Sequence, residues 1–197
     1  MNADTPASPE WIIEFANTED VQALPAIERS AASLFPAGFL PSGAEQETLP
    51  AAVLHEAQAE GRLFVARERA DGGVVGFALV EAIDGVGHLE EIDVDPAWGR
   101  RGIGRALVLR ACEWARAKGY ADITLITFRE IPWNAPFYAR LGFLLLEEAA
   151  IGNAMLPKLS REAAAGFDPT QRCVMRLRLV DSSRISAAPS RTGAASR

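Results

Sequence analysis

The segment EEIDVDPAWGRRGIG, from Glu90 to Gly104, offers the clearest chemistry in the sequence. Its glycines allow the backbone to turn N–H groups toward a ligand, and the helix expected to follow adds the positive end of a dipole. Arg100, Arg101 and Arg105 add formal positive charge. Together these features predict a site for a polyanion such as a pyrophosphate.

Two familiar phosphate loops fit this segment poorly. A Walker loop requires a lysine before a serine or threonine, and the segment contains no lysine. A dinucleotide fingerprint requires a small third residue, where this chain has Leu107 after Gly102 and Gly104. Taken alone, the segment also fits a simple turn between a strand and a helix.

A second segment, WNAPFYARLGF from Trp133 to Phe143, combines polar and aromatic residues at helical spacing. Asn134 and Tyr138 lie four residues apart and therefore share a helix face. Taken alone, Asn134 fits a helix cap and Phe137 a core residue. The pattern becomes informative only beside the first segment.

Together the two segments resemble the GNAT superfamily of acyl-CoA-dependent N-acetyltransferases. Gly102-Ile103-Gly104 matches the family loop, and the Asn-x-x-x-Tyr and Tyr-x-x-x-Gly-Phe patterns begin at Asn134 and Tyr138. Gly99 stands where the family usually has arginine or glutamine, so side-chain contacts would shift to neighbouring arginines. The resemblance covers roughly residues 11–180.

The resemblance implies a GNAT fold of the α+β type within the α/β class: a mixed, mostly antiparallel sheet of six to seven strands flanked by helices. The strand ending at Val94 is expected to splay from its neighbour, and the pantetheine arm of acetyl-CoA would lie in that gap, paired with the strand backbone. The cofactor-binding residues implied are Ile92, Asp93, Val94, Arg100, Arg101, Gly102, Ile103, Gly104, Arg105, Asn134, Phe137 and Tyr138.

The implied chemistry is attack of a neutral amine on the thioester, which requires a base for the ammonium proton and an acid for the leaving thiolate. Tyr138 matches the family tyrosine that supplies the acid. Strand alternation puts His88 and Glu90 on one face and Glu91 on the other, unless a bulge changes the parity. We rank Glu90 first as the base and Glu91 second. Alternatively, these carboxylates only attract a cationic acceptor.

The elements that must position these residues follow from hydropathy periods and turn signals. Residues 35–50 form a loop with three prolines. We expect strands over residues 11–15, 63–68, 74–82, 87–94, 123–127, 143–147 and 173–180, and helices over residues 21–34, 51–61, 103–118, 134–140 and 157–165. We assign residues 1–10 to a flexible N-terminus, 11–180 to one domain and 181–197, rich in Ser, Ala and Arg, to a disordered tail.

Composition and charge limit the classes of partner that the protein is expected to bind. The 197 residues carry 26 acidic and 20 basic side chains, a net charge of -6, which argues against a nucleic-acid binder. Cys112 and Cys173 form no CxxC pair, and no apolar run is long enough to span a membrane. These features predict a cytoplasmic protein without a metal or a membrane partner. The resemblance to the family also leads us to expect a homodimer.

We therefore expect an N-acetyltransferase that transfers an acetyl group from acetyl-CoA to a primary amine in a ternary complex. The acceptor is a small molecule or a peptide. Its selection depends on the loop 35–50, the first two helices and the connection 149–171, which carry the least motif content. The alternative is a non-catalytic acyl-CoA-binding regulatory module, which would bind acyl-CoA without turnover.

Overall fold

The computed structural model of the chain describes residues 9–153 and 155–179. Its helices and strands follow one another in the order that the sequence predicts, and short 3₁₀ turns join several of them. In chain order, the elements are β1 (Trp11–Phe15), α1 (Leu24–Ala32), α2 (Ala51–Ala59), β2 (Leu63–Glu68), β3 (Val74–Ile83), β4 (Val86–Val94), α3 (Ile103–Ala117), β5 (Asp122–Phe128), α4 (Ala135–Arg140), β6 (Leu144–Leu145), α5 (Leu156–Ala164) and β7 (Arg172–Arg178).

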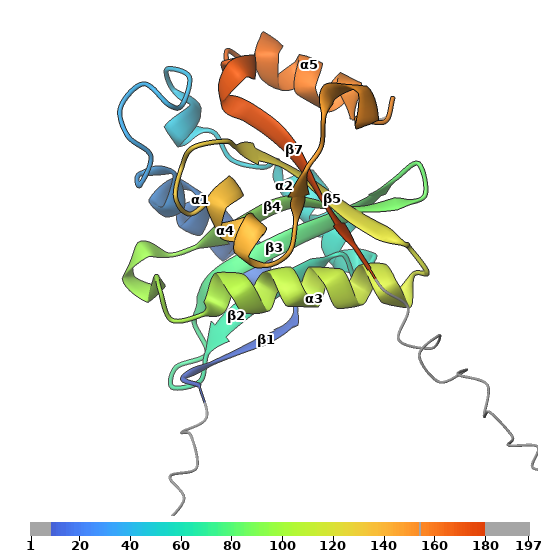
Figure 1. Cartoon of the computed structure of the whole chain (residues 1–197). Coiled ribbons are helices and arrows are strands. Elements are labelled where there is room, and N and C mark those ends of the chain that lie inside the picture. Colours follow the sequence, from blue (N-terminus) through green and yellow to red (C-terminus); the bar gives the residue numbers. More distant parts are fainter. Residues whose placement is uncertain (1–8, 154, 180–197) are drawn as a thin grey trace, which may run out of the picture.

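The strands form one seven-stranded sheet in the order β1-β2-β3-β4-β5-β7-β6. All neighbouring strands are antiparallel except β4 and β5, which are parallel. Helix α3 covers one face and helices α1 and α2 cover the other (Figure 1). The predicted mixed, mostly antiparallel sheet flanked by helices is confirmed.

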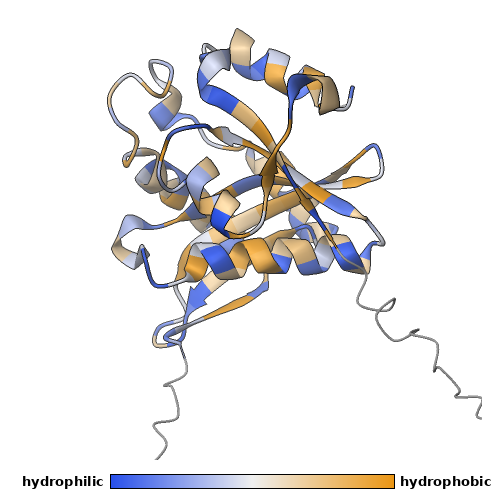
Figure 2. Ribbon diagram, in the orientation of Figure 1, coloured by the Kyte–Doolittle hydropathy of each residue, from blue (hydrophilic) through white to orange (hydrophobic). Residues whose placement is uncertain are grey.

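The core has two parts because the sheet is covered on both faces. Leu107 and Ala111 of α3 pack with Leu89 and Leu125 of the sheet. On the opposite face, apolar residues of α1 and α2 pack with β2 and β3, as Leu24 and Leu54 do with Phe77 and Leu79. The alternation of orange and blue along α3 in Figure 2 reflects this amphipathic packing.

Most predicted elements differ from the observed ones by one or two residues at an end, and two of them differ more extensively. The helix expected over residues 21–34 begins as a 3₁₀ turn at Asp20–Ala23, and the α-helix starts at Leu24. Pro25 has no N–H group, so it cannot continue an α-helix from the preceding turn. The strand expected over residues 143–147 is only Leu144–Leu145, because just these two residues pair with β7.

The ends of the chain lie largely outside the described residues. This applies to the tail assigned to residues 181–197 and to residues 1–8 of the assigned N-terminus. Glu10 is held in place, since its carbonyl accepts a hydrogen bond from Arg69 N–H at 2.8 Å. Within residues 9–153 and 155–179, none of the helices combines the length and hydrophobicity needed to cross a bilayer.

Strands β4 and β5 separate along half their length, as predicted. They pair only from Gly87 to Leu89, which leaves Glu90–Val94 of β4 bonded to β3 alone. A bulge marks the point of separation, because Leu79 of β3 pairs with Glu91 while the next residue, Val80, pairs with Leu89. We call Glu90–Val94 the open half of β4.

Candidate active site

The open half of β4 directs backbone groups into the gap left by β5. Asp95 N–H donates to the Val75 carbonyl of β3 at 2.9 Å. Because residues of an antiparallel pair alternate between facing the partner and facing away, the N–H and C=O groups of Val94 and Ile92 face the gap. Both residues belong to the set that the family resemblance implies for cofactor binding.

The loop after β4 forms a cradle of backbone N–H groups. Gly102 (φ 83°) and Arg100 (φ 59°) are both in the left-handed region, and α3 begins directly after Gly102. Within the described part of the chain, the N–H groups of residues 100–105 donate no hydrogen bond. Such a concave run of unpaired donors at a helix N-terminus suits a polyanion.

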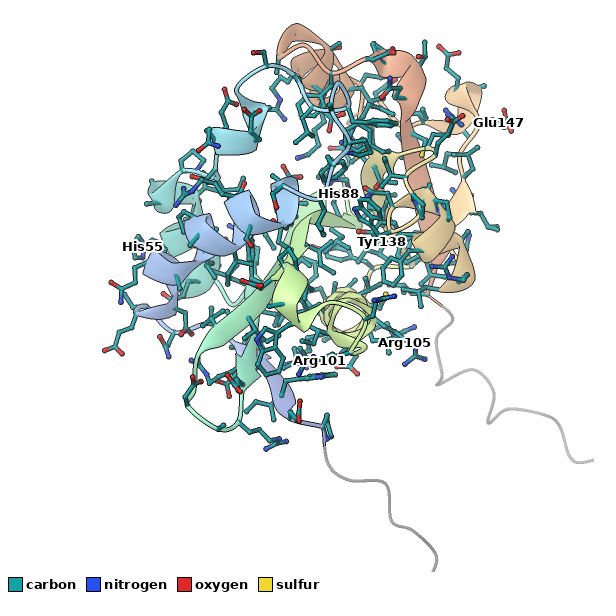
Figure 3. All side chains as sticks on the ribbon, turned by 90° about the vertical axis from the view of Figure 1, so that its left-hand side faces the viewer. His55, His88, Arg101, Arg105, Tyr138 and Glu147 are labelled. Carbon is teal, nitrogen blue, oxygen red and sulfur yellow. The ribbon has the colours of Figure 1, made fainter. Side chains whose placement is uncertain are left out.

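The three arginines of the loop differ in their surroundings. Arg101 contacts Glu10 at 2.9 Å and stacks over the Trp98 ring at 4.5 Å, which holds it toward β1. Arg100 and Arg105 are exposed. Figure 3 shows Arg101 and Arg105 beside the N-terminal end of α3. Arg100 and Arg105 therefore supply the positive charge available to a ligand, and Arg101 is already engaged by a carboxylate.

Helix α4 brings the second motif to the same gap. The Thr127 hydroxyl donates to Asn134 Oδ1 at 2.6 Å, so the amide N–H₂ group of Asn134 faces away from Thr127. A side chain at Gly104 would meet the Phe137 ring at 3.7 Å and Val94 at 4.0 Å. The first turn of α3, the end of β4 and Phe137 thus adjoin, as the predicted cofactor site requires.

Tyr138 lies buried in the field of two β4 carboxylates. It is 6% exposed, and Figure 3 shows it near the middle of the molecule. Burial raises the pKa of its phenol, and Glu91 and Asp93 raise it further. The phenol therefore keeps its proton throughout the physiological pH range and can act as a proton donor.

The bulge places Glu91 and Asp93 on the face of the sheet covered by α1. They pair with Leu79 and Phe77, which both pack under the helices of that face. Burial raises the pKa of Glu91 to about 8, and Glu28 of α1 and Glu90 add to the effect. Burial, together with Glu91 and Glu28, raises the pKa of Asp93 well above its usual range.

Glu90 has a different environment from Glu91. Its carboxylate contacts His88 Nε2 at 3.4 Å and the Lys158 ammonium group of α5. Burial acts to raise the pKa of Glu90, but the contacts with His88 and Lys158 outweigh it and hold the pKa at about 2. A carboxylate this acidic is a weak base, whereas Glu91 is matched to a proton transfer near neutral pH.

Several residues of the site were missed by reasoning from the sequence. Glu28 comes from the first helix, Lys158 from α5 and Arg172 from β7, and no motif marks them. Arg172 stacks over Phe128 at 4.4 Å and pairs with Glu162 at 2.7 Å. The side chains meet only in the folded chain, so their sequence spacing carries no signal.

Among the described residues, one set of side chains lies close enough to hold a metal ion: Glu81, His88 and Glu90. The Lys158 ammonium group contacts both carboxylates, so this set already surrounds a cation. We propose no metal there.

The motifs and the geometry agree with the comparison to known families. A model of the acetyltransferase (GNAT) family matches residues 24–143, more than half of the chain. The chain belongs to this family.

Known relatives match parts of the chain. Glucosamine 6-phosphate N-acetyltransferase from Trypanosoma brucei brucei is 40% identical over 58 residues, covering 29% of this chain and 37% of the relative. Mycothiol acetyltransferase from Geodermatophilus obscurus is 35% identical over 119 residues, covering 60% of this chain and 35% of the relative. The matches thus span little more than a third of these curated relatives.

A solved structure extends the likeness to nearly the whole fold. PaiA N-acetyltransferase from Thermoplasma acidophilum, in complex with coenzyme A, superposes with a TM-score of 0.61 at 17% identity. The superposition covers 85% of this chain and 98% of that structure. At this identity the likeness shows the shared fold.

Proposed function

We propose that the chain is an N-acetyltransferase that transfers the acetyl group of acetyl-CoA directly to a primary amine in a ternary complex. The observation that carries the proposal is the meeting of a backbone-lined gap with a proton donor and a carboxylate of raised pKa. Val94 and Ile92 line the gap, Tyr138 lies buried beside it, and Glu91 lies on the adjoining strand face.

The chain's own groups fit acetyl-CoA. The unpaired N–H groups of residues 100–105 would bind the pyrophosphate, with Arg100 and Arg105 adding charge. The backbone of Ile92 and Val94 would pair with the pantetheine arm as a missing strand does, whereas the backbone of Asp93, which the resemblance also implied, faces β3. Asn134 and Phe137 would complete the site at the thioester end, and Arg101 would contribute chiefly its backbone.

Catalysis follows from the two titrating groups. Glu91, ranked second from the sequence, becomes our first choice of base because its pKa of about 8 suits removal of an ammonium proton. The freed amine attacks the thioester carbon, with the Val94 N–H group stabilising the oxyanion. The C–N bond forms, the C–S bond breaks, and the leaving thiolate takes its proton from Tyr138. The Tyr138 phenolate then regains a proton from the nitrogen of the new amide.

The second candidate is a non-catalytic acyl-CoA-binding module. A thiol-release assay with acetyl-CoA and a panel of primary amines separates the two functions. We expect amine-dependent release of coenzyme A and an acetylated product identified by mass spectrometry. Acetyl-CoA binding without turnover above background for every amine would establish the binding module instead.

We also propose that the protein forms a homodimer. We propose a cytoplasmic location as well, because the buried thiols of Cys112 and Cys173 are free. The acceptor proposed is a small molecule or a peptide, with no nucleic-acid or membrane partner.

A further inference from the structure

Helix α5 places a lysine among two carboxylates and a histidine beside the open half of β4. Lys158 Nζ lies 2.6 Å from Glu81 Oε1 and also contacts Glu90 Oε2. One ligand atom from each of Glu81, His88 and Glu90 lies within 4.8 Å of the others. A primary ammonium group carries three N–H donors and a positive charge, and the two carboxylates offer it two charged acceptors beside the His88 ring. We call these three residues the ammonium pocket.

Buried hydrogen bonds orient His88 toward this pocket. His88 is 2% exposed, and its Nδ1 lies 2.9 Å from Thr124 Oγ1. The Thr124 hydroxyl donates to the Gly87 carbonyl at 3.2 Å, so its oxygen accepts from His88 Nδ1–H. The ring then directs Nε2 toward Glu90 Oε2, which lies 3.4 Å away.

The pocket and its occupant differ in how firmly the fold holds them. Glu81 and Glu90 lie on β3 and β4, adjacent strands of the central sheet. In contrast, no residue of Leu156–Ala164 in α5 is buried. Its charged contacts within the described residues are those of Lys158 and the pair between Glu162 and Arg172. An element with so few buried apolar contacts opens at a low free-energy cost.

The pocket also lies at a useful distance from the proposed reaction centre. Glu90 precedes Val94 by four residues, which corresponds to about 13 Å along a strand. A long aliphatic diamine can bridge that separation, with one amine at the thioester and the other at the pocket.

We propose that the ammonium pocket binds a second ammonium group of the acceptor, and that Lys158 fills the pocket until the acceptor displaces it. This inference rests on the proposed acetyl transfer and specifies its acceptor as a long diamine or polyamine. Glu90 is then a binding residue for the acceptor, and Glu91 carries the proton transfer.

The test removes the internal lysine. We compare Lys158→Ala with wild type, using diaminodecane and aminodecanol as acceptors that differ only in the second amine. The variant should lower KM for diaminodecane about tenfold, since one charge-assisted contact no longer has to be displaced, and leave KM for aminodecanol nearly unchanged. Arg161→Ala, which removes an exposed charge from the same helix, should change neither KM.

Two further arms keep the outcome decisive. Lys158→Met retains the apolar stem and replaces Lys158→Ala if that variant does not fold. Adding Glu81→Gln should abolish the gain for diaminodecane. An equal change in KM for both acceptors, in either direction, would show that Lys158 only ties α5 to the sheet.

Calorimetry separates this inference from the proposed function. Diaminodecane should bind the Lys158→Ala variant without coenzyme A, and more tightly than it binds wild type. If no amine is acetylated, the proposed function fails, and the binding result still decides the pocket. Equal binding to both proteins, or none to the variant, would overturn the pocket.

Discussion

The two sides of the β4–β5 gap are built from different parts of the chain. The proposed cofactor side uses backbone groups of one continuous stretch, from Ile92 to Arg105. The proposed acceptor side uses side chains from α1, β3, β4, α4 and α5, including Glu28, Glu81 and Lys158. A backbone site needs glycine at fixed places, whereas a side-chain site can be assembled from any elements that meet. The first kind is fixed by local backbone geometry, and the second can change with the packing of the elements that carry it.

The largest expected effect tests the acid on the acceptor side. Tyr138→Phe should lower kcat about a hundredfold, because the thiolate loses its proton donor, and leave the Kd for coenzyme A nearly unchanged. Tyr120→Phe is the matched control, because the other tyrosine packs against Trp114 with ring centroids 5.8 Å apart. Steady-state kinetics and calorimetry provide both quantities. An unchanged kcat would remove Tyr138 from the acid role.

The next effect distinguishes the two carboxylates of the bulge. Glu91→Gln should lower kcat about thirtyfold, since the proposed base is lost. Glu90→Gln should act mainly on KM for a diamine, because Glu90 contacts Lys158 rather than the reacting amine. The same kinetic assay run on both variants decides the order. A larger loss of kcat for Glu90→Gln would return the base to Glu90.

A smaller effect tests the cofactor side. Gly102→Ala should raise KM for acetyl-CoA about tenfold, because a side chain at φ 83° strains the N–H cradle. Gly119→Ala is the control: it has φ 81° beyond the other end of α3, with nothing within 4 Å of an added side chain. Both variants should lose similar thermal stability. A similar KM for both would mean that backbone strain at Gly102 is irrelevant to binding.

The smallest effect concerns stability and pH. Because the pKa of Glu91 is about 8 in the folded chain against an ordinary value of 4.5, folding favours its protonated form. Its ionisation therefore destabilises the fold progressively as pH rises from about 4.5 to about 8. Glu91→Gln should raise Tm relative to wild type above this range and make little difference below it. A Tm difference that is constant with pH would contradict the raised pKa.

The sequence predicted the side of the gap built from backbone groups better than the side built from side chains. The glycines at 102 and 104, the Asn134–Tyr138 spacing and the alternating strands predicted the fold, and they supplied the residues of the proposed cradle and the proposed acid. The hydropathy period gave the parity of Glu90 and Glu91 only up to the bulge, which moves Glu91 to the α1 face. The partners Glu28 and Lys158 depend on packing between segments far apart in sequence, which no local pattern records.

The most direct measurement of the central claim is a quenched single turnover with excess enzyme and acetyl-CoA labelled in its acetyl group. Direct transfer predicts no thiol release before an amine is added. After addition, free coenzyme A and labelled acetyl-amine should appear at one common rate, with no label on the protein. Label on the protein before the amine arrives, or thiol release without an amine, would contradict direct transfer in the gap.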